Sequence, residues 1–430
     1  MTVICIGYYD KFSRYFLDIK KHLDTQHNST LNFKIYSIHL SGFLYNFFRL
    51  KFSSWIALKA WLIVFRKKRF YKTTIKTSDT YKGISYNDHI KFHLALNSKI
   101  SKKALQLQAL AYIDIFDTQF KKEQPDFLLT LGDSRLCIEI AIALAKQQNI
   151  KIYFIEQGPF NTTFFDNEGV NANLSIRKKF NSNTTLQSLP KTATTSKPYK
   201  RSPFYRGMDF LCAMLFEHTA IYPPDLKHTD VIHHPLKKPD NSLEDSRKTT
   251  QPYVFLILQV PKDVNMIYHS PNFKTHTEII TSVYSNLPKD VKLIIREHPL
   301  YINKYDASMY EFAHKNNITI DNNTPLIDAI NFAKIVVVNN STVGIESILA
   351  YKTVVVLGNA FYDNDQICLK LKTKEDLSSI LEKAMYNVPD TVKIDTFKKA
   401  LYNSVLLQGA ITDDTIQSSK TIAQHLLETH

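Results

Sequence analysis

Short apolar runs alternate with helical segments through the second half of this chain, and this alternation limits the possible folds more than any other feature. The run YVFLILQV begins at Tyr253, and the runs VKLIIREHP, NITIDN, IVVVNN and TVVVLG follow it. Stretches with helical spacing lie between most of them. Strands joined by helical crossovers run parallel, and a parallel sheet needs helices on both faces. The pattern therefore predicts an α/β domain.

The first half repeats the pattern. TVICIGY and NFKIYSIHL read as strands on either side of a helical segment, Phe12 to Leu23. A second crossover is predicted from a strand at Phe127–Leu131, a helix at Leu136–Gln148 and a strand at Lys151–Ile155. Because 430 residues are too many for one ordinary core, two domains are expected.

The predicted fold class is α/β of the GT-B type, in which two Rossmann-like domains face a cleft and a C-terminal helix closes back. The expected domains are residues 1–245, residues 246–400 and a helical tail at 401–430. Leu236–Pro252 is the expected linker, and the polar stretch Asn171–Lys200 is expected to be a long loop.

Cysteine usage and hydropathy predict a cytoplasmic protein. The four cysteines are far apart and form no CxxC motif, so we expect reduced core thiols. The N-terminus reads as a strand and not as a signal peptide. No run reaches about 18 uncharged apolar residues, so no membrane-spanning helix is predicted.

Positive charge is concentrated in Phe43–Lys76, within a chain of net charge +14. This segment holds nine basic residues among aromatic ones and no acid. Such a mixture favours peripheral contact with an anionic membrane at the inner face of the cytoplasmic membrane. A buried helix with a solvated basic end is the alternative. No nucleic-acid-binding motif accompanies the charge, so a nucleic-acid partner is not predicted.

The stretch VVVNNSTVGIESILAYKTVVVLGNAFYD places polar residues where a strand ends and a helix starts. Ligands of parallel α/β sheets lie outside the carboxyl ends of the strands. Ser341 and Thr342 would add hydroxyl donors to a phosphate site, Gly344 would allow close approach of the backbone, and Glu346 would accept hydrogen bonds from sugar hydroxyls. The alternative is a capped helix with one exposed acid.

Two further strand exits in the same half carry polar side chains. Arg296 and His298 follow the run KLII and are candidates for holding a leaving phosphate. Gln259 and Asp263 follow YVFLIL, and Asp263 is a candidate nucleophile or base. His269 and Ser270 would add polar contacts. A structural histidine and a turn aspartate are the corresponding alternatives.

One strand exit in the first half carries carboxylates. Glu156 and Asp166 lie in YFIEQGPFNTTFFDNEGVN and suit activation of an acceptor hydroxyl, or alternatively mark ordinary turns. The DND string at Asp363–Asp365 is interpreted as a loop, so no metal site is predicted.

Taken in order, the segments EQGPFNTTFFDNEGVN, LQVPKDVN, HSPNF, REHP and NNSTVGIESILAYKTVVVLGNAFYD resemble the bacterial capsule and O-antigen family of retaining β-Kdo transferases. These enzymes transfer 3-deoxy-D-manno-octulosonic acid (Kdo) from CMP-β-Kdo to a glycan or glycolipid. The resemblance covers roughly Ile155 to Asp363.

The resemblance implies a role for each matching residue. Asp263 would be the covalent nucleophile, and Glu156 would assist the acceptor hydroxyl, although Gln157 stands where some relatives carry a second acid. His298, Ser341 and Thr342 would bind the phosphate or the Kdo carboxylate. No metal or cofactor is implied beyond the CMP-sugar donor.

Two rival functions remain open at this point. A CMP-sialic acid transferase of the same fold would use the same nucleotide site. A basic membrane-surface or nucleic-acid-binding protein without catalysis would use only the charged segment.

Overall fold

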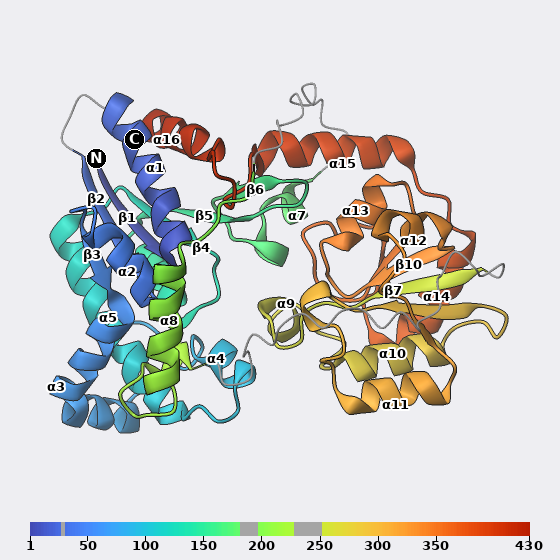
Figure 1. Cartoon of the computed structure of the whole chain (residues 1–430), viewed down its shortest axis with the longest axis horizontal. Helices are drawn as coiled ribbons and strands as arrows, with labels where there is room; N and C mark the ends of the chain where they lie inside the picture. Colours follow the sequence, from blue (N-terminus) through green and yellow to red (C-terminus); the bar gives the residue numbers. More distant parts are fainter. Residues whose placement is uncertain (27–30, 181–196, 228–251) are drawn as a thin grey trace. The chain divides into compact units, whose positions relative to one another are not determined.

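The computed structural model describes residues 1–26, 31–180, 197–227 and 252–430, which form two compact units (Figure 1). Unit 1 contains the described residues up to 170, residues 197–227 and residues 405–430. Unit 2 contains residues 171–180 and 252–404. The chain therefore passes from unit 1 into unit 2 twice, and it returns to unit 1 for the second time after Ser404.

Unit 1 is built on a seven-stranded sheet of order β13-β6-β5-β4-β1-β2-β3. The five strands from β5 to β3 are parallel, and β6 and β13 add an antiparallel edge. The strands are β1 (Thr2–Gly7), β2 (Asn32–Ser37), β3 (Ser53–Trp55), β4 (Phe127–Leu131), β5 (Lys151–Gln157), β6 (Thr162–Asp166) and β13 (Leu406–Gln408).

Helices cover both faces of this sheet because alternate residues of β1 and β4 point to opposite sides. Val3 and Leu129 pack with α1 and α16, whereas Ile4 and Leu128 pack with α3, α5 and α6. The helices of unit 1 are α1 (Asp10–Gln26), α2 (Leu40–Phe47), α3 (Ile56–Thr77), α4 (Lys91–Leu96), α5 (Lys102–Glu123), α6 (Leu136–Gln147), α8 (Pro203–Phe216) and α16 (Ser418–Thr429).

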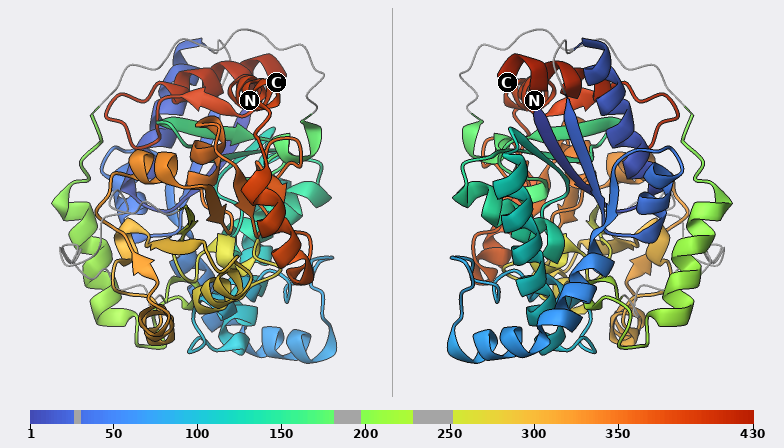
Figure 2. Two further views of the ribbon diagram at one scale, coloured as in Figure 1. Left: turned by 90° about the vertical axis from the view of Figure 1, so that its right-hand side faces the viewer. Right: turned by 90° about the vertical axis from the view of Figure 1, so that its left-hand side faces the viewer.

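The predicted return of the C-terminal helix is confirmed. Strand β13 pairs antiparallel with β6, and α16 then packs beside α1 (Figure 2). A buried hydrogen bond of 2.7 Å joins the Tyr15 hydroxyl to Ser418 Oγ, which is also 3.0 Å from Thr163 Oγ1. Both termini contact Asp126, which accepts from the Thr2 N–H and lies 3.3 Å from His430 Nε2.

Unit 2 contains a fully parallel six-stranded sheet of order β9-β8-β7-β10-β11-β12. Its strands are β7 (Tyr253–Ile257), β8 (Lys292–Arg296), β9 (Thr319–Ile320), β10 (Ile335–Val338), β11 (Val354–Val356) and β12 (Leu369–Lys370). Its helices are α7 (Ile176–Lys179), α9 (Val264–Ile267), α10 (His276–Ser285), α11 (Ala307–Lys315), α12 (Leu326–Phe332), α13 (Val343–Leu349), α14 (Leu377–Tyr386) and α15 (Thr391–Ser404).

The strand order of unit 2 is the order of the Rossmann fold, in which the chain builds outward from β7 in one direction and then in the other. The direction reverses between β7 and β10. Unit 1 has the same reversal between β1 and β4. Both units are therefore Rossmann-like, which confirms the predicted α/β class.

The segments between these units differ in part from their predicted character. Residues 171–180, expected to belong to a loop, form a 3₁₀ turn at Asn171–Asn173 and then α7. Residues 181–196 lie outside the described residues, as does the expected linker except for Pro252. The expected tail at 401–430 includes the end of α15 in unit 2, and from Val405 onward it completes unit 1.

In the described parts of the chain, no helix combines the length and apolarity needed to cross a bilayer.

We predict that Ile422→Ala destabilises unit 1 by about 2–4 kcal/mol, because Ile422 is fully buried between α16 and α1 and the truncation leaves a cavity. Hydrogen exchange read by mass spectrometry should show faster exchange in α1, β6 and β13. Exchange in β7 and β10 should not change.

The exposed Lys420→Ala on the same helix is the matched control and should exchange as the wild type does. Equal acceleration in both units after Ile422→Ala would contradict this assignment of α16 to unit 1.

Candidate functional site

The carboxyl ends of β7 and β10 flank the point where the strand order of unit 2 reverses. In an open parallel sheet the loops at this point separate and leave a crevice, where ligands bind. The loop after β7 carries Gln259 and Asp263, and the loop after β10 carries Asn339 to Thr342. Four of the predicted donor-site residues therefore lie in the two loops that flank this reversal point.

Gln259 and Asn340 connect the two loops directly. The Asn340 N–H donates to Gln259 Oε1 at 3.4 Å, and Asn340 Nδ2 donates to the carbonyls of Asn265 and His269 at 3.0 Å each. Both side chains are buried, yet Gln259 Nε2 and Asn340 Oδ1 have no hydrogen-bond partner. Buried polar atoms are nearly always paired, so these atoms indicate a place for a ligand or water.

A third unpaired atom lies near the same loops. His269 is buried, and its Nε2 also has no partner. Burial and the charge of Arg177 lower the pKa of His269 to about 4, so the ring is neutral near pH 7. The His269 carbonyl fixes the loop after β11, because it accepts from the Asn359 N–H at 2.7 Å.

Asp263 caps the short helix α9. Its Oδ1 accepts from the Met266 N–H at 2.9 Å, which fixes the orientation of the carboxylate. Lys262, immediately before it, adopts a positive φ of 57°. Burial raises the pKa of Asp263 to about 6. A fixed, poorly solvated carboxylate of this kind is suited to act as a nucleophile or a base.

His298 is joined to the loop after β7 through Tyr305. The His298 N–H donates to the Tyr305 hydroxyl at 3.1 Å, and that hydroxyl donates to the Gln259 carbonyl at 3.0 Å. His298 Nδ1 accepts from the Leu300 N–H at 3.2 Å, so in the neutral ring the proton is on Nε2. Burial lowers the pKa of His298. The side chain is thus a neutral N–H donor at this edge.

The Arg296 side chain donates hydrogen bonds to the protein's own backbone. Its Nη1 donates to the carbonyls of Asp321, at 3.4 Å, and Thr324, which fixes the loop after β9. The neighbouring Glu297 is buried and accepts from Asn303 N–H at 3.1 Å and from Asn322 Nδ2 at 2.6 Å. Both residues shape the loop that presents His298.

The side chains of the NNST segment differ in their exposure to solvent. Asn339 and Asn340 are buried, whereas Ser341 is half-buried and Thr342 is exposed. Ser341 Oγ accepts from the Val343 N–H at 3.3 Å, and the Thr342 side chain caps no N–H of α13. The hydroxyl of Thr342 is therefore available to solvent or to a ligand.

Gly344 and Glu346 follow on α13. A Cβ at Gly344 would overlap the ring and hydroxyl of Tyr362, whose O–H donates to the Ser341 carbonyl. The close approach predicted at this glycine is thus made by Tyr362. Glu346 is half-buried, and burial raises its pKa.

Asp363, part of the DND string, is held by two cations. It forms a bidentate pair with Arg177, with Nε–Oδ1 at 2.7 Å and Nη2–Oδ2 at 2.8 Å, and it lies 3.2 Å from Lys370 Nζ. The pair joins residues 171–180 to the rest of unit 2. Within the described residues, no group of three or more His, Cys, Asp or Glu side chains is placed to hold a metal ion.

Glu156 lies in unit 1, at the end of β5. Burial raises its pKa, and the charge of Asp133 adds to this effect while Lys11 opposes it. Asp133, at the end of β4, is thus the carboxylate that influences Glu156. Asp166, the partner proposed from the sequence, is buried and accepts from the Glu168 N–H at 2.6 Å.

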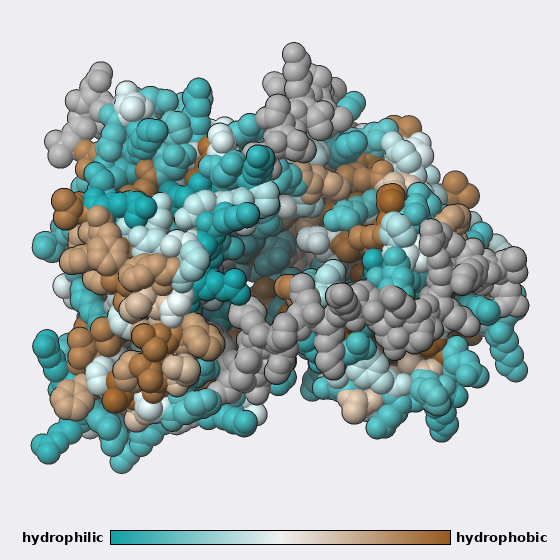
Figure 3. Space-filling view, in the orientation of Figure 1, coloured by the Kyte–Doolittle hydropathy of each residue, from teal (hydrophilic) through white to brown (hydrophobic). Residues whose placement is uncertain are grey.

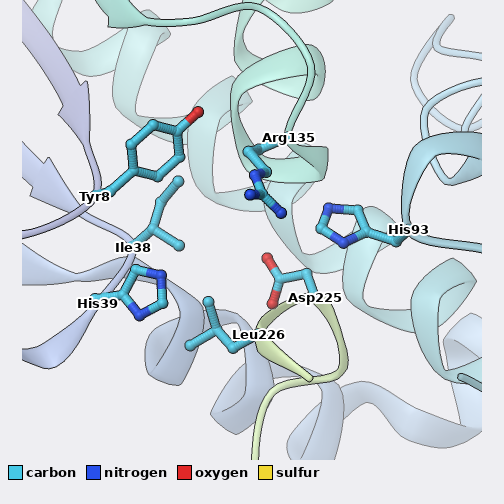
Figure 4. A pocket seen from close by; sticks show the side chains of 7 residues that line it. All are labelled: Tyr8, Ile38, His39, His93, Arg135, Asp225 and Leu226. Carbon is cyan, nitrogen blue, oxygen red and sulfur yellow. The ribbon is translucent and has the colours of Figure 1, made fainter. Parts of the chain in front are cut away.

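A small enclosed pocket lies at the reversal point of unit 1, beside the ends of β1, β2 and β4 (Figure 4). His93 Nε2 accepts from the Leu136 N–H at 3.1 Å, so Nδ1 carries the proton of the neutral ring, and this buried atom has no partner. The buried Nη1 of Arg135 has none either. Tyr8, Ile38, His39, Asp225 and Leu226 complete the lining. Two unpaired donors favour an acceptor oxygen here.

Comparison with known proteins connects unit 2 to a family. Residues 230–399 match the family described as "Capsule polysaccharide biosynthesis protein". Gln259, Asp263, His298 and the NNST loop all lie within this capsule polysaccharide biosynthesis segment, whereas Glu156 and Arg177 lie before it.

Two curated proteins match part of the chain. Protein FixF of Sinorhizobium fredii is 30% identical over 169 residues, which cover 37% of this chain and 40% of FixF. The capsule polysaccharide export protein KpsS of Escherichia coli is 31% identical over 122 residues, covering 26% and 31% respectively. The chain spans less than half the length of each of these relatives.

Among solved structures, the KpsC β-Kdo 2,7 transferase of Thermosulfurimonas dismutans is similar over 73% of this chain and 90% of that chain, with 15% identity. Its TM-score is 0.39.

Sequence reasoning found the strand exits but missed several partners of the predicted residues. Arg177 and Asn340 lie far along the chain from the residues they hold, and Tyr305 lies 46 residues from Gln259. Two signals were present. Asn339 and Asn340 precede Ser341 in the same motif, and a lone arginine next to two lysines lies within the polar stretch Asn171–Lys200.

We predict that Asp263→Asn stabilises the protein at pH 7.5. The carboxyl titrates near 6 in the folded chain and near 4 in the unfolded chain, so stability is lost as the pH rises through the folded pKa. Asparagine is neutral and remains a good N-cap. The gain should be about 1–2 kcal/mol at pH 7.5 and vanish below pH 4, measured by urea denaturation across pH.

The matched control is Asp390→Asn, because a hydrogen bond from the Lys393 N–H lowers the pKa of Asp390. This variant should show no gain at pH 7.5. If Asp263→Asn were less stable than the wild type at pH 7.5, the carboxylate would be a stabilising group and the assignment would be wrong.

Proposed function

We propose that this protein is a glycosyltransferase of surface polysaccharide synthesis that moves Kdo from CMP-β-Kdo to a glycan or glycolipid acceptor with retention of configuration. The observation that carries the proposal is the set of polar groups on the loops that follow β7 and β10 of unit 2. It combines the oriented carboxylate of Asp263 with three buried and unpaired polar atoms, on Gln259, His269 and Asn340. The capsule polysaccharide biosynthesis segment contains all four residues.

The donor has the chemistry that these residues can bind. CMP carries a phosphate and Kdo carries a carboxylate, so hydrogen-bond donors must stabilise negative charge as the leaving group departs. His298 Nε2–H and Gln259 Nε2–H are neutral donors, and the Ser341 and Thr342 hydroxyls add two more. Glu346 is assigned to a hydroxyl of the nucleotide sugar.

In the first displacement, an oxygen of Asp263 attacks the anomeric carbon of Kdo. The bond from that carbon to the phosphate oxygen breaks, and its electron pair leaves with CMP. A glycosyl ester with inverted configuration is formed on Asp263. The pKa near 6 keeps the carboxylate ionised at neutral pH, as the attack requires.

In the second displacement, the acceptor hydroxyl attacks the same carbon and releases the Asp263 carboxylate. Two inversions give net retention. Glu156 accepts the proton of the hydroxyl, and burial makes it a stronger base by raising its pKa. The oxygen of the acceptor becomes the glycosidic oxygen.

We predict that Glu156→Gln accumulates the glycosyl-enzyme. Loss of the base slows the second displacement only, so CMP-Kdo should give a rapid release of about one equivalent of CMP and a protein mass increased by one Kdo residue. Rapid quench and intact-protein mass spectrometry measure both. The double variant Asp263→Ala/Glu156→Gln should show neither.

Parallel incubations with CMP-sialic acid identify the donor. CMP release from CMP-sialic acid alone would overturn the Kdo assignment and leave the nucleotide site intact. An adduct that persisted in the double variant would show that Asp263 is not the nucleophile.

A further inference from the structure

Helix α8 (Pro203–Phe216) of unit 1 has no buried residue, although its sequence PFYRGMDFLCAMLF is mostly apolar. Its side chains divide between two faces. The half-buried face carries Tyr205, Met208, Asp209 and Cys212. The opposite face carries the exposed positions 204, 207, 210, 211, 214 and 215, spaced as one side of a helix and without charge.

Polar contacts fix the inner face of α8 to α2. Asp209 Oδ1 accepts from the Ser41 N–H at 2.9 Å, and its Oδ2 pairs with Arg201 at 3.1 Å. The Tyr205 hydroxyl accepts from Arg49 Nη1 at 3.1 Å. The helix is therefore held so that its apolar face points outward.

This apolar face continues onto α2 and α3. The rings of Phe48 and Phe204 lie 6.0 Å apart, and the Trp61 indole donates to the Ala220 carbonyl at 3.1 Å. Figure 3 shows the hydrophobic side chains gathered over α8 and its neighbours α2 and α3. The apolar patch consists of the exposed side chains Phe47, Phe48, Leu50, Phe52, Leu62, Phe65, Phe204, Phe210, Leu211, Met214, Leu215 and Ile221.

The predicted segment Phe43–Lys76 contributes to this patch in an unexpected way. The start of α3 is buried in the core at Ile56, Ala57 and Ala60. Its later half is mostly exposed and basic, as the alternative of a buried helix with a solvated basic end describes, and the membrane contact stays a prediction. The basic border of the patch comprises the exposed Arg49, Lys51, Arg66, Lys67, Lys68, Arg69, Lys72, Lys76 and Arg206.

An open pocket of about 420 Å³ adjoins this border. Lys21, Arg49 and Lys51 line it together with Lys20, which pairs with Asp24. Arg49 belongs to the pocket and also bonds to Tyr205 of α8, so the pocket and the apolar patch are directly connected. The pocket has the size and charge for a phosphate-bearing headgroup.

We infer that the apolar patch and its basic border form a surface that binds an anionic lipid bilayer, with α8 as the inserted element. The phosphate headgroup of an anionic lipid occupies the pocket at Lys21, Arg49 and Lys51. The exposed apolar face of α8 enters the boundary between headgroups and acyl chains. This inference does not depend on the sugar that the protein transfers.

The positive charge of the basic border favours an anionic bilayer over a second copy of the chain as the binding partner. In a two-fold dimer the patch would face itself, and the basic border of one copy would meet that of the other. The segment Phe43–Lys76 contains no acid to compensate for this repulsion. An anionic bilayer provides both an apolar interior and negative headgroups.

The test is co-sedimentation of the full chain with vesicles of phosphatidylcholine alone or with 30% phosphatidylglycerol. We expect binding to the anionic vesicles only, weakening as salt rises. Phe210→Ser/Met214→Ser should lower binding at least about tenfold, because two large apolar groups no longer enter the bilayer. Lys21→Glu/Lys51→Glu should lower it similarly.

The matched control is Tyr386→Ser/Val388→Ser, which removes two equally exposed apolar side chains from unit 2 and should bind as the wild type does. Circular dichroism confirms that each variant is folded. Equal binding to neutral vesicles, or a dimer in sedimentation velocity that the α8 variant abolishes without any vesicle binding, would overturn the inference.

Discussion

The parallel pairing of β7 with β10 is the constraint on which the rest of unit 2 depends. Because these strands are neighbours in the sheet but distant along the chain, the loops that follow them meet at the point where the strand order reverses. The amide of Asn340 and the side chain of Gln259 hold these two loops together. In unit 1 the pairing of β1 with β4 has the same place in the strand order, and a small pocket lies beside it.

Buried polar atoms without hydrogen-bond partners lie at the reversal points of both sheets. A folded protein normally pairs its buried polar groups, since each unpaired one costs stability. In unit 2, one side-chain atom each of Gln259, His269 and Asn340 has no hydrogen-bond partner, and all three residues lie at one edge of the sheet. In unit 1, one side-chain atom each of His93 and Arg135 has none. Hydrogen-bonding groups that a ligand or water could satisfy therefore remain at the points where the strand order reverses.

Local periodicity predicted most of the architecture. The apolar runs and helical stretches correctly gave the two α/β units, and the rule that ligands lie at strand ends gave Asp263, His298 and Ser341. Contacts between distant parts of the chain were not predictable. No local signal indicated that Arg177 would pair with Asp363, that Asp133 would influence Glu156, or that α8 would expose its apolar face. At Gly344 the sequence predicted close approach of the backbone to a ligand, whereas the structure shows that the absence of a side chain makes room for the ring of Tyr362.

The placement of β13 and α16 has a consequence for biosynthesis. During translation, residues 252–404, which hold all six strands of unit 2, emerge from the ribosome before residues 405–430, so the core of unit 2 can be completed first. Unit 1 must wait for those residues, and until then the open side of β6 is an unprotected edge strand. The half of the chain that is made first is thus the half that matures last, and its nascent form is the one that would need a chaperone.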